Sequence, residues 1–121
     1  MKSKNRKLGD RAEDMVVKYA RRRGWKILAR NWEKPWGEID IVAREGATVL
    51  FIEVKAQSAP SPWFKPEDHF DFKKRERLAR ICQSYLLENG YGDDADYRID
   101  LAAVEMGHSD PAERIRYYEN V

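Results

Sequence analysis

The sequence predicts an α/β protein in which a central mixed sheet is flanked by helices. The main observation is a pair of stretches, 38–44 and 48–56, that are rich in Ile, Val, Leu and Phe and are separated by a turn containing Gly46. Such runs are typical of central strands in a covered sheet. The elements predicted in chain order are a helix at 6–23, strands at 25–32, 38–44 and 48–56, a helix at 71–89, and strands at 97–105 and 113–121. At 121 residues, the chain is expected to form a single domain, residues 1–121.

The first predicted helix, 6–23, carries an apolar stripe. Its members follow the i, i+4, i+7, i+11 spacing of a core-facing surface, and they are Leu8, Ala12, Met15 and Tyr19. Gly24 is a natural end for this helix. Glu13 lies about 100–120° from the centre of the stripe, if each residue turns the helix by about 100°. On spacing alone we therefore expect Glu13 to face solvent.

The two central strands contain charged residues that a fold does not need. Because side chains alternate along a strand, Glu38 and Asp40 are expected on one face, with Ile39 and Ile41 on the other. The same rule places four residues of the next strand on one face, namely Phe51, Glu53, Lys55 and Gln57. A buried charge costs several kcal/mol unless it is paired or binds an ion (order of magnitude). The charges therefore indicate a functional surface.

The rest of the chain supplies loops and a second helix. Pro35 and Gly37 predict a turn at 33–37, and prolines predict a stiff loop at 58–70 beside the charged strands. Two further turns are expected at 91–96 and 106–112. The first turns of the second helix are rich in cations, which either meet a phosphate backbone or simply face water.

Composition limits the class of protein. No apolar run approaches the roughly 18 residues of a membrane span, and the basic N-terminus has no apolar signal segment. A single cysteine, Cys82, excludes an internal disulfide and predicts a cytoplasmic location. Residues 1–30 hold 11 Lys/Arg and 3 Asp/Glu, whereas the remainder holds 12 and 18. This basic arm indicates either a polyanionic partner or a solvated helix face.

The spacing of the charges suggests metal chemistry. Glu53 follows Asp40 by 13 residues, and Lys55 comes two residues later. If the strands pair across their short turn, the three side chains converge at one end of the sheet. Two neighbouring carboxylates repel each other, and a divalent cation such as Mg²⁺ relieves that repulsion. A bound metal would polarise a phosphodiester, and Lys55 would orient or deprotonate a water molecule.

These residues carry a family resemblance. The segments GEID and IEVK, which contain Asp40, Glu53 and Lys55, resemble the PD-(D/E)xK signature of the restriction-endonuclease-like superfamily. The chain resembles the YraN family of predicted endonucleases within it, which is similar to archaeal Holliday-junction resolvases. The matching segments are Gly9 with Ala12 and Glu13, and residues 24–31, 37–40, 51–55, 73–78, 98–100 and 119–120.

The resemblance implies a fold and a set of site residues. The fold would be restriction-endonuclease-like, with an α-β-β-β-α-β core. Asp40 and Glu53 would be metal ligands, Lys55 the catalytic lysine, and Glu13 a carboxylate that completes the metal shell. Glu38 would then lie beside the metal ligands without binding the metal, although pairing with Lys34 or Arg44 explains a charged residue at this position equally well. Gln57 is expected to contact substrate, and Asp100 is expected to bind Arg98 or a backbone group.

The expected function is a Mg²⁺-dependent (or Mn²⁺-dependent) endonuclease that hydrolyses DNA, with branched, Holliday-junction-like structures as candidate substrates. The same chemistry would also serve RNA. With little room for a sequence-reading domain, recognition would depend on phosphates and shape. The candidate phosphate contacts are Lys7, Arg11, Lys73, Lys74 and Arg77. By analogy with resolvases, a homodimer is expected. The alternatives are a catalytically silent nucleic-acid-binding module and a structural adaptor with the same fold.

Overall fold

The computed structural model describes residues 4–107 and 114–121. Its elements are α1 (Lys4–Arg22), β1 (Lys26–Lys34), β2 (Gly37–Glu45), β3 (Thr48–Gln57), the 3₁₀ helix η1 (Pro66–His69), α2 (Phe72–Glu88), β4 (Tyr97–Glu105) and β5 (Ile115–Tyr118). The predicted order of helices and strands is confirmed. The short helix η1 was not predicted, and the predicted turn at 106–112 lies mostly outside the described residues.

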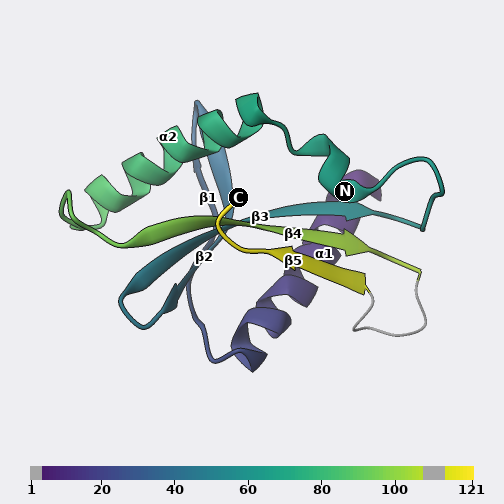
Figure 1. Cartoon of the computed structure of the whole chain (residues 1–121), viewed down its shortest axis with the longest axis horizontal. Coiled ribbons are helices and arrows are strands. Elements are labelled where there is room, and N and C mark those ends of the chain that lie inside the picture. Colours follow the sequence, from purple (N-terminus) through teal and green to yellow (C-terminus); the bar gives the residue numbers. More distant parts are fainter. Residues whose placement is uncertain (1–3, 108–113) are drawn as a thin grey trace.

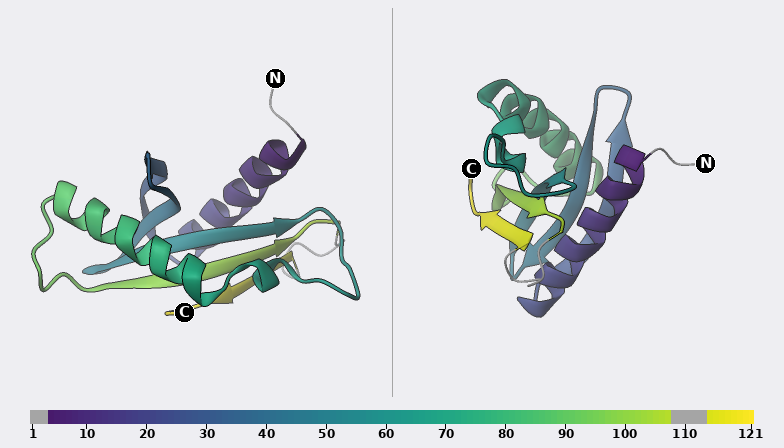
Figure 2. Two further views of the ribbon diagram at one scale, coloured as in Figure 1. Left: turned by 90° about the horizontal axis from the view of Figure 1, so that it is seen from above. Right: turned by 90° about the vertical axis from the view of Figure 1, so that its right-hand side faces the viewer.

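The five strands form one mixed sheet in the order β1-β2-β3-β4-β5. β3 and β4 are parallel, and the other neighbours are antiparallel. The parallel pair needs a long connection, and α2 lies within that connection (Figure 1). α1 and α2 cover opposite faces of the sheet (Figure 2). The predicted α-β-β-β-α-β core is thus confirmed.

Each helix builds its own hydrophobic cluster against the sheet. The α1 cluster includes Val16, Leu50 and Ile52, whereas the α2 cluster includes Phe51 and Ile81. Burial on both faces explains why β2 and β3 read as nearly continuous apolar runs.

The buried side of α1 differs from the predicted stripe. Ala12, Val16 and Ala20 are fully buried, whereas Leu8, Met15 and Tyr19 are only partly buried at the edge of the cluster. The helix is therefore rotated toward the flank that carries Glu13, and Glu13 itself is buried. The expectation from spacing that Glu13 faces solvent is wrong, because the small side chains of this flank allow α1 to pack closely on the sheet.

Strand β2 breaks its alternation at Asp40. Ile39 packs in the α2 cluster and Ile41 in the α1 cluster, so the prediction that they share a face is wrong. The pairing of β2 with β3 runs from Ile41–Ile52 to Glu45–Thr48, and the start of β2 extends beyond it. On the other side, β2 remains paired with β1 as far as Gly37. The sheet is therefore open between β2 and β3 at the end that carries Asp40.

Two further features position this end of the sheet. In β1, Asn31 has a left-handed backbone (φ 51°), and the residues on either side of it, Arg30 and Trp32, pair with Ile41 and Ile39. Asn31 therefore lies opposite Asp40. No helix within residues 4–107 or 114–121 is long and apolar enough to cross a membrane.

Candidate functional site

Asp40 closes the gap between β2 and β3 with its side chain. Its Oδ2 accepts a hydrogen bond of 2.8 Å from the backbone N–H of Val54. If β2 stayed paired with β3 at this point, a backbone carbonyl of β2 would accept that hydrogen bond instead. This bond holds the carboxylate between the two strands, next to Glu53. The face switch at Asp40 therefore has a consequence for the site, since it directs the side chain into the opening of the sheet.

Asp40 and Glu53 form a close carboxyl pair. The pKa of Asp40 is raised from 3.8 to about 8, chiefly by burial and then by a carboxyl–carboxyl hydrogen bond to Glu53 and the negative charge of Glu53. The Val54 N–H opposes this rise because it stabilises the charged form. Without a cation, Asp40 therefore favours its protonated form at neutral pH.

Glu13 reaches the same place from α1. It is only 8% exposed, and its pKa is raised from 4.5 to about 7 by burial first and then by the charge of Asp40. Arg30 and a hydrogen bond from Asn31 partly offset the rise. One carboxyl oxygen, Oε1, makes no hydrogen bond within the described part of the chain, and an Arg30 nitrogen lies 3.8 Å from it. A buried oxygen of this kind is free to accept a cation.

Glu38 is the fourth carboxylate. Its pKa is raised to about 7 by burial, followed by a hydrogen bond to Asp40 and the charge of Asp40. The alternative that Glu38 pairs with Lys34 or Arg44 is wrong, because neither cation forms an ion pair with it within the described residues, and Lys34 Nζ contacts Glu88 Oε1 at 2.6 Å instead. The structure thus brings together the predicted carboxylates Glu13, Glu38, Asp40 and Glu53, although they come from α1, β2 and β3.

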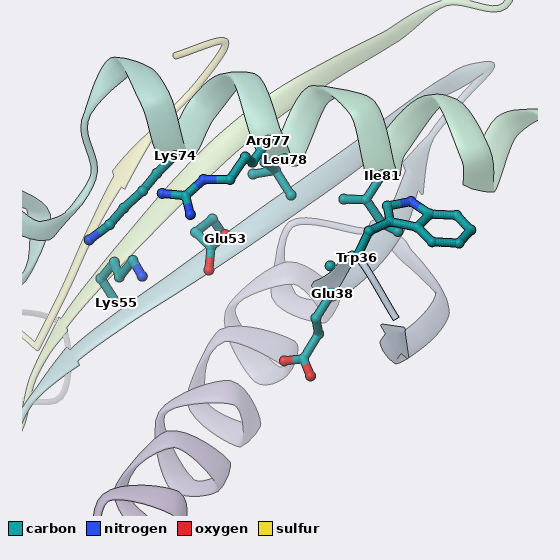
Figure 3. A pocket seen from close by; sticks show the side chains of 9 residues that line it. Trp36, Glu38, Glu53, Lys55, Lys74, Arg77, Leu78 and Ile81 are labelled. Atoms are coloured by element: carbon teal, nitrogen blue, oxygen red, sulfur yellow. The ribbon is translucent and has the colours of Figure 1, made fainter. Parts of the chain in front are cut away.

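Three cavities surround these carboxylates. The first, of about 290 Å³, lies between β3 and α2 and is lined by Trp36, Gly37, Glu38, Glu53, Lys55, Lys74, Arg77, Leu78 and Ile81 (Figure 3). The second, of about 230 Å³, lies between α1 and β3 and shares Lys55 with the first. The third, of about 440 Å³, shares Glu13 with the second and Glu38 with the first. Since the cavities share these residues, the site is reachable from both helical layers.

The predicted cations divide into two groups. Lys55, Lys74 and Arg77 line the first cavity, and Figure 3 shows Lys74 and Arg77 extending from α2 on the side of β3 that carries Glu53 and Lys55. Lys74 Nζ also donates a hydrogen bond to the His69 carbonyl. The other predicted phosphate contacts are exposed and lie outside the three cavities, and they are Lys7, Arg11 and Lys73.

Gln57 and Asp100 have other partners. Gln57 Nε2 donates a 2.7 Å hydrogen bond to the Ala59 carbonyl, so its amide is engaged with the following loop. Asp100 is fully buried and accepts hydrogen bonds from Arg98 Nε, Tyr117 Oη and the Asn120 N–H. The expectation that Asp100 binds Arg98 or a backbone group is confirmed.

Asn31 is a site residue that was not singled out from the sequence. Its hydrogen bond to Glu13 and its place in the wall of the third cavity depend on the left-handed turn of β1. Asn adopts this conformation more readily than most residues. The signals in the sequence were an asparagine among strand-forming residues and its position at the end of the family-like segment 24–31, and neither gives Asn31 a role in a site.

The donor set suits a hard divalent cation. Carboxylate oxygens are the protein ligands of Mg²⁺, which needs only one or two of them and keeps several waters. The mutual repulsion of Glu13, Glu38 and Asp40 would be relieved by such a cation. Within the described residues, no three Asp, Glu, His or Cys side chains are already arranged to hold a metal. The arrangement therefore fits two direct carboxylate ligands, Asp40 and Glu53, with other carboxylates nearby.

Comparison with known proteins assigns the chain to a family. Residues 12–104 match the uncharacterised protein family UPF0102. A UPF0102 protein of Desulfitobacterium hafniense is 42% identical over 97 residues, covering 80% of this chain and 79% of its own length. A UPF0102 protein of Alkaliphilus oremlandii is 33% identical over 116 residues, covering 96% and 97%. One from Thermotoga maritima is 37% identical over 93 residues, covering 77% and 82%. The chain belongs to the uncharacterised protein family UPF0102, the YraN family that its motifs resemble.

Proposed function

We propose that this protein is a Mg²⁺- or Mn²⁺-dependent endonuclease that hydrolyses phosphodiester bonds in DNA. The observation that carries the proposal is the group of carboxylates around Asp40, which lies where β2 separates from β3. Burial and the neighbouring carboxylates raise the pKa values of Glu13, Glu38 and Asp40. A cluster of this kind, with a lysine and further cations in the same cavity, is suited to a metal and a phosphate together.

Asp40 and Glu53 would hold the metal, and Glu13 and Glu38 would contribute negative charge around it. When bound, the metal would polarise the phosphodiester and lower the pKa of a water molecule. The Val54 N–H fixes the orientation of the Asp40 carboxylate, so the ligand needs no rearrangement before it binds.

Lys55 lines both the first and the second cavity, next to Glu53 on the same face of β3. In the reaction the Lys55 ammonium would donate a hydrogen bond that orients the attacking water, and it would offset negative charge that develops on the phosphate. Lys74 and Arg77 would bind phosphates at the α2 wall of the cavity. These groups contact charge and shape rather than base sequence, which supports a structured DNA substrate such as a junction.

The resemblance to Holliday-junction resolvases also supports a homodimer, since a four-way junction presents two equivalent cleavage positions. Size measurement of the protein alone and with a junction tests this part separately. A monomer in both conditions would contradict the dimer but would leave the chemistry at Asp40 untouched.

The test of function combines a melting curve with a cleavage assay. The wild type, Asp40→Asn and a matched control, Asp93→Asn in the exposed turn before β4, are melted with EDTA or with millimolar Mg²⁺ or Mn²⁺. They are then incubated with a labelled four-way junction and a linear duplex. We expect a metal-dependent rise in Tm and cleavage for the wild type and control, and neither for Asp40→Asn.

The outcomes separate the competing functions. A metal-dependent rise without cleavage of either DNA, together with salt-sensitive DNA binding that survives Asp40→Asn, would identify a silent nucleic-acid-binding module. If no metal changes the Tm and no DNA is bound or cut, the carboxylates are structural and an adaptor function replaces the nuclease proposal.

A further inference from the structure

An exposed tryptophan lies at the rim of the candidate site. Trp36 is 63% exposed, yet it lines the first cavity together with Glu53, Lys74 and Arg77. In Figure 3 its indole lies beside Ile81, at the opposite end of the cavity from Lys55 and Lys74. The catalytic proposal gives Trp36 no role, and its large apolar surface is costly to leave in water.

The turn that carries Trp36 is fixed to α2. On one side, Lys34 Nζ forms an ion pair of 2.6 Å with Glu88 of α2 and lies 5.1 Å from the centre of the Trp32 ring. On the other side, Gly37 is so close to α2 that a Cβ there would lie 3.6 Å from Ile81 Cβ. The backbone is therefore held by an ion pair on one side of Trp36 and by packing on the other, while most of the indole remains accessible to solvent.

The chemistry of the cavity identifies what could cover this indole. One end holds the cations Lys55, Lys74 and Arg77, which suit phosphate, and the other end holds an aromatic face. A nucleotide combines a phosphate with a flat aromatic base, and bases stack on exposed aromatic side chains whatever their sequence. In a continuous duplex the bases are already stacked and paired, so only an unpaired base is available.

We propose that Trp36 stacks on an unpaired nucleobase of the DNA substrate, next to the phosphate held by Lys74 and Arg77. This proposal rests on the proposed function and narrows its substrate class to structured DNA in which a base at the branch or bulge is unpaired or can leave its pair. Trp36 is a specificity residue in this scheme and takes no part in bond breaking.

The experiment measures DNA binding in EDTA, so that it does not depend on cleavage. Fluorescence anisotropy gives the Kd for a continuous duplex, for the same duplex with a short unpaired bulge, and for that bulge built from abasic nucleotides. The proteins are the wild type, Trp36→Ala, Trp36→Phe and a matched control, Trp63→Ala. Trp63 is 82% exposed in the loop after β3 and lies outside the cavity.

We expect Trp36→Ala to weaken binding of the base-containing bulge by about 5- to 100-fold, which is the range found for loss of one base–aromatic stack. Its affinity for the continuous duplex and the abasic bulge should change little. Trp36→Phe should keep most of the affinity because it keeps an aromatic face, and Trp63→Ala should match the wild type. A melting curve for each variant controls for folding.

Two results would overturn the proposal. One is an equal loss of affinity by Trp36→Ala for all DNA forms, which would make Trp36 a general packing or phosphate-side residue. The other is equal binding of the abasic and base-containing bulges by the wild type. Failure of the nuclease function would show instead as absent cleavage with metal, while the binding differences in EDTA persisted, so the two proposals fail separately.

Discussion

The Asp40 carboxylate accepts a 2.8 Å hydrogen bond from the backbone N–H of Val54, where a strand partner would ordinarily be. A side chain thus serves both as part of the sheet and as part of the candidate site. An asparagine oxygen could accept the same hydrogen bond, and Asp40→Asn should therefore fold while losing the charge. This substitution therefore tests the charge of the site without removing the hydrogen bond that completes the sheet.

The stability of the metal-free protein is predicted to fall as the pH rises from about 4 to about 8. The pKa values of Glu13 and Glu38 are about 7, and that of Asp40 is about 8, all above their ordinary values of 4.5 and 3.8. The folded state therefore keeps protons that the unfolded chain has released. This contribution to stability is complete below the ordinary pKa values and is lost as the pH passes the raised ones.

Urea denaturation in EDTA across this pH range measures the effect, and Asp40→Asn should show a shallower slope. Glu67, whose pKa is lowered to about 2 by Arg116, acts in the opposite sense but only at lower pH. Adding Mg²⁺ should restore stability at high pH. A stability that is level or increasing between about pH 5 and pH 8 would contradict the raised pKa values.

Lys55→Gln is predicted to separate metal binding from catalysis. Because the carboxylates remain, the rise in Tm with Mg²⁺ should persist, whereas cleavage should slow by about 100-fold or more through loss of the positive charge that stabilises the transition state. Lys26→Gln, a surface substitution at the start of β1, is the matched control and should cleave normally. If Lys55→Gln cleaves as fast as the control, Lys55 has no part in the chemistry.

Lys74 and Arg77 are predicted to bind DNA phosphates. Replacing both with glutamine should reduce the slope of log Kd against log salt concentration by about 2, since each phosphate contact contributes about 0.9. Arg80→Gln, an exposed site on the same helix but outside the first cavity, should leave the slope unchanged. The same measurement on Lys7 and Arg11 tests whether the exposed face of α1 adds contacts. An unchanged slope in the double variant would exclude the α2 wall as the phosphate site.

Asp100 is predicted to be structural, although it is the most buried carboxylate of the sheet. Asp100→Asn removes the charge that Arg98 contacts and one acceptor used by the Tyr117 hydroxyl, while Glu45 and Glu119 still pair with Arg98, so we expect a loss of about 1–3 kcal/mol of stability. The rise in Tm with Mg²⁺ should nevertheless remain, measured from the lower starting point. Asp96→Asn, whose hydrogen bond with Thr48 is exposed to solvent, is the control. Loss of the metal effect in Asp100→Asn would place Asp100 in the site.

The sequence was sufficient for the order of elements because the apolar patterns of the strands and helices are long and are separated by Pro or Gly. It was also sufficient to predict that Asp40 and Glu53 lie close together and that Glu53 and Lys55 share one face of β3. Charges in strands that are covered on both faces have few structural explanations. It was not sufficient for the face switch between Ile39 and Ile41. Strict alternation assumes a regular strand, and β2 is irregular where it leaves β3.

Glu13 and Asn31 show a second reason for the limits of sequence-based prediction. The burial of Glu13 depends on how closely α1 approaches the sheet, and the role of Asn31 depends on one left-handed residue in β1. Both depend on contacts between elements, and the spacing of residues within one element does not predict such contacts. The family resemblance, rather than spacing, indicated Glu13.

The two hydrophobic clusters have a consequence for local unfolding. Since α1 packs in one cluster and α2 in the other, α1 could detach and reattach as a unit while the α2 side of the sheet stays folded. Each such opening would carry Glu13 away from Asp40 and leave Lys74 and Arg77 in place. A cation bound at Asp40 and Glu53 would attract the negative charge of Glu13 and so stabilise the contact between α1 and the sheet, and it would slow hydrogen exchange in α1 more than in α2.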